Sequence, residues 1–177
     1  MRKLRKQKGF TLVEMLACIV VLLIIGAMCN TGMNFAFNSY QKSIFESDSQ
    51  MLEDTMNLYI GDILRHATDV QTNGTNVTEF SNVEYRIHEG NLVLQQKSTD
   101  SEEYYLAYTT NRDGEMFTFA VAGESVYAKS LYIDPASWHL EYNTVTGVFT
   151  GSYTIKSTIL DDASRECTFT FRTIASY

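Results

Sequence analysis

The stretch Gly9-Phe10-Thr11-Leu12-Val13-Glu14 lies between two segments of very different character. Before it, residues 1–8 carry five basic side chains, and after it residues 15–29 are almost wholly apolar. A short basic segment followed by an apolar one is typical of a chain that enters a membrane with its basic end on the cytoplasmic side. One carboxylate, that of Glu14, lies at the start of the apolar run, where an ionised group is costly and implies a function.

The apolar run predicts a transmembrane helix over residues 10–29. About twenty residues that rise about 1.5 Å each give about 30 Å, which matches the hydrocarbon thickness of a bilayer. A secretory signal peptide is a poorer description, because its apolar region has about 7–15 residues and ends in small side chains at the cleavage site. The basic residues predict that everything after Cys29 lies outside the cytoplasm.

The helical pattern continues beyond the apolar run. Apolar side chains recur at helical spacing on one face, at Phe37, Tyr40, Ile44, Met51, Met56, Tyr59 and Ile63, and are joined by Leu52, Ile60 and Leu64. This spacing predicts one helix from about Phe10 to about Ala67, roughly 85–90 Å long, with residues 30–68 as its amphipathic continuation.

From residue 69 to 177 the pattern predicts a β-rich head. Residues 68–76 read as a polar break with a turn at Asn73-Gly74, after which apolar and polar residues alternate. The predicted strand pairs are 83–87 with 91–95, 104–110 with 116–122, and 153–159 with 167–172, and single strands are predicted at 126–133 and 138–142. The predicted fold is therefore α+β, with an antiparallel sheet covered by the second half of the long helix.

Charge and composition argue against several function classes. Without the five basic residues of the leader, 9 Lys and Arg stand against 21 acidic residues, a net charge of -12, which argues against direct nucleic-acid binding. His66, His88 and His139 show no metal-ligand spacing, and no catalytic motif is present. Residues 111–115 read as a hairpin turn and not as a calcium loop. We therefore expect no enzyme activity, no metal and no cofactor.

The order of these features resembles the precursor of a type IV pilin or of a type II secretion pseudopilin. The resemblance rests on Lys8-Gly9-Phe10-Thr11-Leu12-Val13-Glu14, followed by an apolar span, an amphipathic helix and a β-rich head. It implies that residues 1–9 are a leader peptide, that a membrane prepilin peptidase cleaves between Gly9 and Phe10, and that the same enzyme methylates the new amino terminus of Phe10. Glycine suits such a site because its backbone can lie close to the peptidase.

The resemblance also implies a role for Glu14 in filament assembly. The Glu14 carboxylate would pair with the Phe10 ammonium of a neighbouring subunit and so set the register of packed helices, more than add net stability. The simpler alternative is that Glu14 lies at the membrane interface and extends to the lipid headgroups.

Two features differ from many type IV pilins. Pro135 is the only proline, so the apolar helix lacks the proline common near the position of Thr31, and Cys167 has no partner for a loop disulfide. The missing proline suits a minor pilin or pseudopilin, and the missing disulfide suits lineages that do not use the loop disulfide. Together they leave the filament system open: a type IV pilus, a type II secretion-like machine or a DNA-uptake filament used in competence.

The implied partners are the membrane, the prepilin peptidase, other pilin subunits and, indirectly, the assembly ATPase and its platform. The implied location is the cytoplasmic (inner) membrane as a single-pass protein with the head outside, and afterwards a surface or periplasm-spanning filament. The alternative is a single-span anchor that carries an extracellular binding or sensor domain and never polymerises. That alternative explains the basic flank and the apolar run, but it does not explain Gly9-Phe10 together with Glu14.

Overall fold

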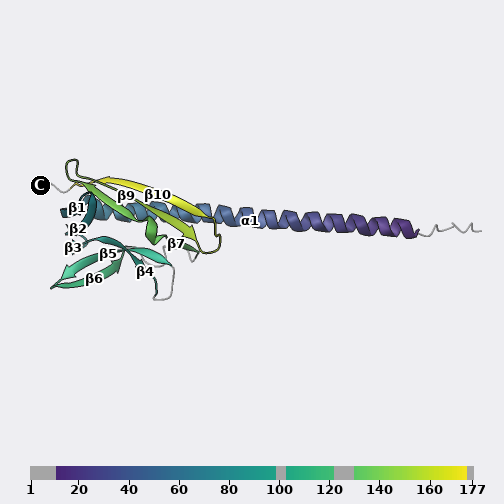
Figure 1. Ribbon diagram of the computed structural model, residues 1–177, viewed down its shortest axis with the longest axis horizontal. Helices are drawn as coiled ribbons and strands as arrows, with labels where there is room; N and C mark the ends of the chain where they lie inside the picture. Colours follow the sequence, from purple (N-terminus) through teal and green to yellow (C-terminus); the bar gives the residue numbers. More distant parts are fainter. Residues whose placement is uncertain (1–10, 99–102, 122–129, 175–177) are drawn as a thin grey trace, which may run out of the picture. The chain divides into compact units, whose positions relative to one another are not determined.

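A computed structural model describes residues 11–98, 103–121 and 130–174 (Figure 1). The chain divides into two compact units, residues 1–43 and 44–177. The elements are α1 (Leu12–Arg65), β1 (Thr68–Asn73), β2 (Asn76–Asn82), β3 (Ile87–Gly90), β4 (Leu92–Gln96), β5 (Tyr104–Arg112), β6 (Glu115–Ala120), β7 (Leu131–Ile133), the short 3-10 helix η2 (Pro135–Ser137), β8 (His139–Asn143), β9 (Val148–Ser157) and β10 (Ser164–Arg172).

The first unit is helical in its described part, and residues 15–29 of that helix are apolar. Every side chain from Thr11 to Tyr40 is exposed, including the large aliphatic ones of the apolar run. Apolar side chains on all sides of a helix are what lipid or a bundle of like helices requires. Within the described residues, α1 is long and apolar enough to cross a membrane, so the chain has one candidate span near its amino terminus.

The second unit, which we call the head, contains two antiparallel sheets (Figure 1). A seven-stranded sheet has the order β1-β2-β8-β9-β10, with β3 also paired to β2 and β7 to β9. A three-stranded sheet has the order β4-β5-β6. The strand pairs are antiparallel, so one α-helix with antiparallel sheets confirms the predicted α+β fold.

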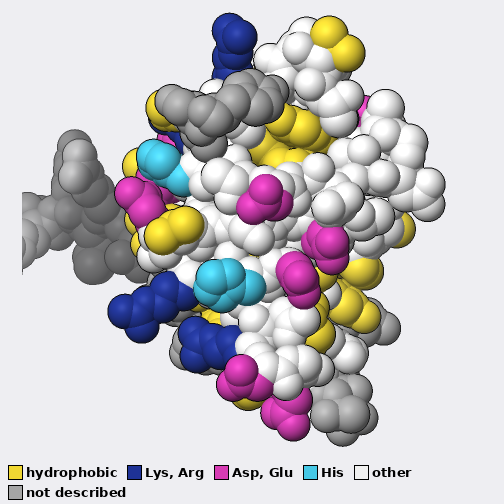
Figure 2. Space-filling model, turned by 90° about the vertical axis from the view of Figure 1, so that its left-hand side faces the viewer, with side chains coloured by type: hydrophobic (Ala, Val, Ile, Leu, Met, Phe, Trp, Pro, Cys, Tyr) yellow, Lys and Arg dark blue, Asp and Glu magenta, His cyan; other side chains and the backbone are white. Residues whose placement is uncertain are grey.

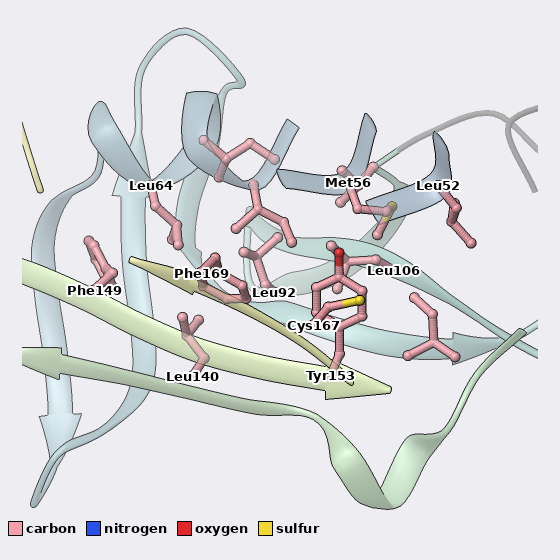
Figure 3. Close-up of a cluster of buried hydrophobic side chains, with 14 of the residues drawn as sticks. Leu52, Met56, Leu64, Leu92, Leu106, Leu140, Phe149, Tyr153, Cys167 and Phe169 are labelled. Atoms are coloured by element: carbon pink, nitrogen blue, oxygen red, sulfur yellow. The ribbon is translucent and has the colours of Figure 1, made fainter. Parts of the chain in front are cut away.

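The head is built around the last turns of α1. Leu52, Met56, Ile60 and Leu64 recur every four residues on one face of the helix and are at most 1% exposed. Figure 3 shows three of them, Leu52, Met56 and Leu64, above the aliphatic and aromatic side chains of the sheets. The sheet side of the core is formed by buried side chains from both sheets: Phe80, Leu92, Leu106, Ile133, Phe149, Tyr153, Ile155 and Phe169.

Three residues of the predicted apolar face are exposed, namely Phe37 and Tyr40 in the first unit and Met51 in the head. Met51 is 70% exposed, whereas its neighbour Leu52 is 1% exposed. Successive helical residues point about 100° apart, since a turn has 3.6 residues, so a stripe that passes through Leu52 and Met56 leaves Met51 at its edge. The sequence pattern contained both residues and could not decide between them.

α1 ends at Arg65, two residues before the predicted end, and each of its last three carbonyls accepts a hydrogen bond from outside the helix pattern. A helix end leaves carbonyls without helical partners, so buried ends need other donors. The donors are Asn82 Nδ2 for Ile63 (2.7 Å), the Ala67 amide for Leu64 (3.3 Å) and the Ile174 amide for Arg65 (2.7 Å). Asp69, already within β1, takes the left-handed conformation, with φ of 52°, where the register of the strand shifts between Thr68 and Gln71.

Two predictions in the first part of the head were wrong. Residues 68–73 form strand β1 instead of a polar break, and β1 pairs with β2 across the turn at Gly74. Residues 83–86 form a turn instead of a strand, so β3 pairs with β2 and not with 91–95. Every second residue of β1 is exposed and the others are only half-buried, which explains why its sequence resembled a loop.

The later hairpins are confirmed with small changes in length. β5 and β6 join through Asp113 and Gly114, both left-handed with φ of 56° and 88°, which is the geometry of a tight hairpin turn. β9 and β10 pair with Cys167 opposite Tyr153. β9 ends at Ser157, so Ile159, predicted on the apolar face, is 61% exposed. Of the predicted strand 126–133, β7 is observed and residues 126–129 lie outside the described residues.

Cys167 is a core residue. Its side chain is 1% exposed in the cluster that contains Tyr153 and Phe169 (Figure 3). Burial raises the pKa of the thiol to about 11, so it stays protonated near neutral pH. A buried neutral thiol packs as a small apolar group and is a poor nucleophile.

Gly90 gives a stability prediction, because β3 passes very close to β5 there. A Cβ atom at Gly90 would lie 1.9 Å from the Thr109 carbonyl oxygen, which belongs to the backbone of β5. We expect Gly90→Ala to lower the free energy of unfolding of the head by roughly 2–3 kcal/mol, since the strands must separate. Denaturant titration of the full chain in detergent measures this through Trp138, the only tryptophan.

The matched control is Gly32→Ala. A Cβ atom at Gly32 meets nothing within 4 Å, so the unfolding midpoint of the head should not change. A Gly90→Ala variant with the unfolding midpoint of the unmodified chain would contradict the close approach of β3 and β5.

Candidate functional site

The amino-terminal site begins, in the described part of the chain, at Thr11. Gly9 and Phe10, the predicted cleavage and methylation residues, lie outside the described residues and stay predictions. α1 starts at Leu12, which makes Thr11 the capping residue and places Glu14 three residues into the helix. The predicted assembly residue is therefore in the first turn of α1.

Thr11 and Glu14 form a capping box. The Thr11 amide and the Thr11 hydroxyl both donate hydrogen bonds to Glu14 Oε2, each at 2.9 Å. In return, the Glu14 amide donates to Thr11 Oγ1 at 3.3 Å. This reciprocal pattern satisfies amides that the helix start leaves without partners, and the negative charge of Glu14 complements the helix dipole.

The capping box fixes where the Glu14 charge is located. Both residues are exposed, and the carboxylate is held at the amino-terminal end of the helix, against the amide of the residue that follows Phe10. Sequence reasoning assigned Glu14 to a contact between subunits and missed this contact within the chain. The signal was present, since Thr-x-x-Glu before an apolar run is a capping-box pattern.

The helix continues without interruption through the position where many pilins have a proline. Thr31 Oγ1 donates to the Ala27 carbonyl at 3.0 Å, as a hydroxyl does inside a regular helix. A proline there would remove a backbone donor and bend the helix, and the helix of this chain contains no proline.

One group in the head has the chemistry of a metal site, which the sequence analysis did not predict. His66 lies beside Asp62 and Glu84, and one donor atom from each lies within 4.8 Å of the others. His88 and His139 do not belong to any such group within residues 11–98, 103–121 and 130–174. The missed signal is the four-residue spacing of Asp62 and His66, which places both on one helix face. Glu84 comes from the turn that was predicted to be a strand.

The surface of the head is mixed in charge. On the face that Figure 2 shows, acidic side chains are spread over the surface and the basic ones lie near its edges. A nucleic-acid interface would require basic side chains gathered into a patch or stripe.

A comparison with protein families found a match at the amino terminus. Residues 4–29 match the family described as "Prokaryotic N-terminal methylation motif". Neither the curated proteins nor the solved structures gave a significant match. The matched segment contains Gly9, Phe10 and the capping box, and it ends where the apolar run ends. This motif, together with one apolar helix and antiparallel sheets, supports a membrane-anchored precursor of the type IV pilin-like prepilin family, whose members are structural proteins.

Proposed function

We propose that the chain is a structural subunit, a minor pilin or pseudopilin, of a type IV pilus, a type II secretion-like machine or a DNA-uptake filament. The observation that carries the proposal is the methylation motif at residues 4–29, whose apolar part, residues 15–29, is helical and exposes its side chains on every side. Such a helix needs lipid around it before assembly and neighbouring helices afterwards.

Processing is the first step of the proposed function. A prepilin peptidase removes residues 1–9 on the cytoplasmic side and methylates Phe10. The five basic residues of the leader hold the bond between Gly9 and Phe10 at that membrane surface. The head, with its net negative charge and antiparallel sheets, lies on the other side of the membrane.

Glu14 then supports assembly. Cleavage creates an ammonium group at Phe10, and a charge of either sign is costly when it is unpaired in an apolar filament core. The bonds from Thr11 go to Glu14 Oε2, so Oε1 is the oxygen that accepts the ammonium of a neighbouring subunit. This ion pair between Glu14 and the Phe10 ammonium sets the axial register between neighbouring helices. The assembly ATPase and its platform act on the subunit from the cytoplasmic side.

Mass spectrometry of the mature amino terminus tests this proposal. In cells with an active prepilin peptidase, we expect the chain to begin at Phe10 and to carry one methyl group on its amine. The alternative, an anchored binding or sensor domain, keeps Met1 and the leader. An intact leader in such cells would therefore exclude the filament proposal.

A further inference from the structure

We propose that Asp62, His66 and Glu84 bind one divalent transition-metal ion of the zinc class at the carboxyl end of α1. The site would join the last turn of the helix to the turn between β2 and β3. The inference does not depend on processing or filament assembly, because all three residues belong to the head.

The donor atoms are close to the spacing that zinc requires. His66 Nδ1 lies 3.5 Å from Glu84 Oε2 and 3.9 Å from Asp62 Oδ1. Ligands about 2.0–2.2 Å from a tetrahedral zinc ion lie roughly 3.4 Å from one another. The side chains are 38–60% exposed, so small rotations bring the three donors to these distances without disturbing the core. Water completes the coordination.

The chemistry of the donors selects the class of metal. Imidazole nitrogen is a ligand for zinc, cobalt, nickel and copper, whereas calcium and magnesium take oxygen ligands. His66 Nδ1 also lies 3.0 Å from the Asp62 carbonyl oxygen. In one tautomer Nδ1 donates its proton to that carbonyl, and in the other, with the proton on Nε2, Nδ1 offers a lone pair to the metal.

Local charge favours a cation at this place. Asp62 and Glu84 bring two carboxylates, and the carboxyl end of a helix carries partial negative charge. Asp62 and His66 lie one turn apart on the same face of the helix, so a metal that binds both spans its last turn.

Buried contacts hold the two segments of the site in place. Asn82 is fully buried, and its Nδ2 donates to the Ile63 carbonyl at 2.7 Å. Its Oδ1 accepts from the Tyr85 amide at 3.1 Å, so one side chain fixes the turn that carries Glu84 to the helix end. A site of this kind is supported by its surroundings before any metal binds.

Tyr85 orients one of the ligands. The Tyr85 hydroxyl donates to Asp62 Oδ2 at 2.6 Å and leaves Oδ1 on the side of His66. Residues that hold a metal ligand by a hydrogen bond commonly change metal affinity about 10–100-fold when they are replaced.

The test is a metal titration of the full chain in detergent. Exposed thiols at Cys18 and Cys29 can also take zinc, so all samples carry Cys18→Ala and Cys29→Ala. We expect one equivalent of Zn²⁺ to bind in calorimetry, and one equivalent of Co²⁺ to give the visible absorption of a coordinated ion. Zinc should also raise the melting temperature of the head, because it binds the folded state.

Variants separate the site from other binding. His66→Gln and Glu84→Gln should each weaken zinc binding at least tenfold and remove the zinc-dependent rise in melting temperature. Tyr85→Phe should weaken binding about tenfold while keeping all three ligands. The control is His88→Gln, an exposed histidine outside the group, which should bind zinc like the parent chain.

Two results would overturn the inference. One is the lack of a saturable equivalent of zinc in the parent chain. The other is unchanged affinity in His66→Gln, which would show that the three side chains make only a surface ion pair. Melting curves without metal verify that each variant is folded, so that lost binding cannot be confused with lost structure.

Discussion

Replacing Gly9 by valine leaves the chain as a full-length precursor in the membrane. Glycine lets the peptidase approach the bond between Gly9 and Phe10 closely, and a β-branched side chain displaces that bond from the catalytic groups. A displacement of about 1 Å costs roughly 100-fold in rate. We therefore expect processing of Gly9→Val to fall by about that factor, measured as the ratio of precursor to mature chain by immunoblot after a pulse of synthesis.

Gly9→Ala is the graded control. One methyl group disturbs the approach less than an isopropyl group, so Gly9→Ala should be cleaved at an intermediate rate. Both variants keep the basic residues and the apolar helix, so equal amounts should reach the membrane. Normal processing of Gly9→Val would contradict the cleavage site and, with it, the proposed processing step.

The coarse fold could be predicted because the sequence patterns that indicate it extend over many residues. An apolar run and a continuing helical stripe extend over tens of residues, and they predicted α1 to within about two residues at its carboxyl end. The stop at Arg65 could not be predicted. It depends on Asn82 and on the amide of Ile174, which come to the helix end only in the folded head.

The first strands were predicted less well because their patterns are short and polar. The turn at residues 83–86 contains Val83 and Tyr85, which favour strands, but Asn82 accepts from the Tyr85 amide and bends the chain there. Val83 is consequently 80% exposed. The hydrogen bond of the buried Asn82 side chain therefore outweighs the strand propensity of Val83 and Tyr85.

The candidate sites show the same division between local and distant contacts. Thr11 and Glu14 are three residues apart, so the sequence alone contains the pattern of their capping box. The group around His66 was only partly readable. Asp62 has a suggestive spacing, but Glu84 reaches His66 through the pairing of β2 with β3.

Three substitutions separate the two roles of Glu14, as a cap within the chain and as a partner for a neighbour. Glu14→Gln keeps a side chain that can complete the capping box but removes the charge. Thr11→Ala removes the hydroxyl of the capping box but keeps the charge. Glu14→Ala removes both. All three should insert into the membrane normally, because the basic leader and apolar helix are unchanged.

The charge should matter more than the cap. Breaking a buried ion pair costs about 3–5 kcal/mol, which corresponds to at least about 100-fold, whereas losing a helix cap costs about 1 kcal/mol. We expect Glu14→Gln and Glu14→Ala to lower recovery in sheared filaments by about 100-fold relative to the membrane pool. Thr11→Ala should lower it only several-fold, and immunoblots of the two fractions measure the ratio.

The opposite order of effects would show that Glu14 acts within its own chain. In that case Glu14→Gln assembles normally, whereas Thr11→Ala and Glu14→Ala both fail. Assembly would then depend on the capping box at the helix start and not on an ion pair between Glu14 and the Phe10 ammonium of a neighbouring subunit. Normal recovery of all three variants would remove Glu14 from assembly altogether, as expected of a subunit at the filament tip with no neighbour above it. Glu14 Oε2 accepts both hydrogen bonds from Thr11, which leaves Oε1 for a neighbouring ammonium. Glutamine can still accept the hydrogen bonds of the cap but has no charge, so Glu14→Gln tests the ion pair without removing the cap.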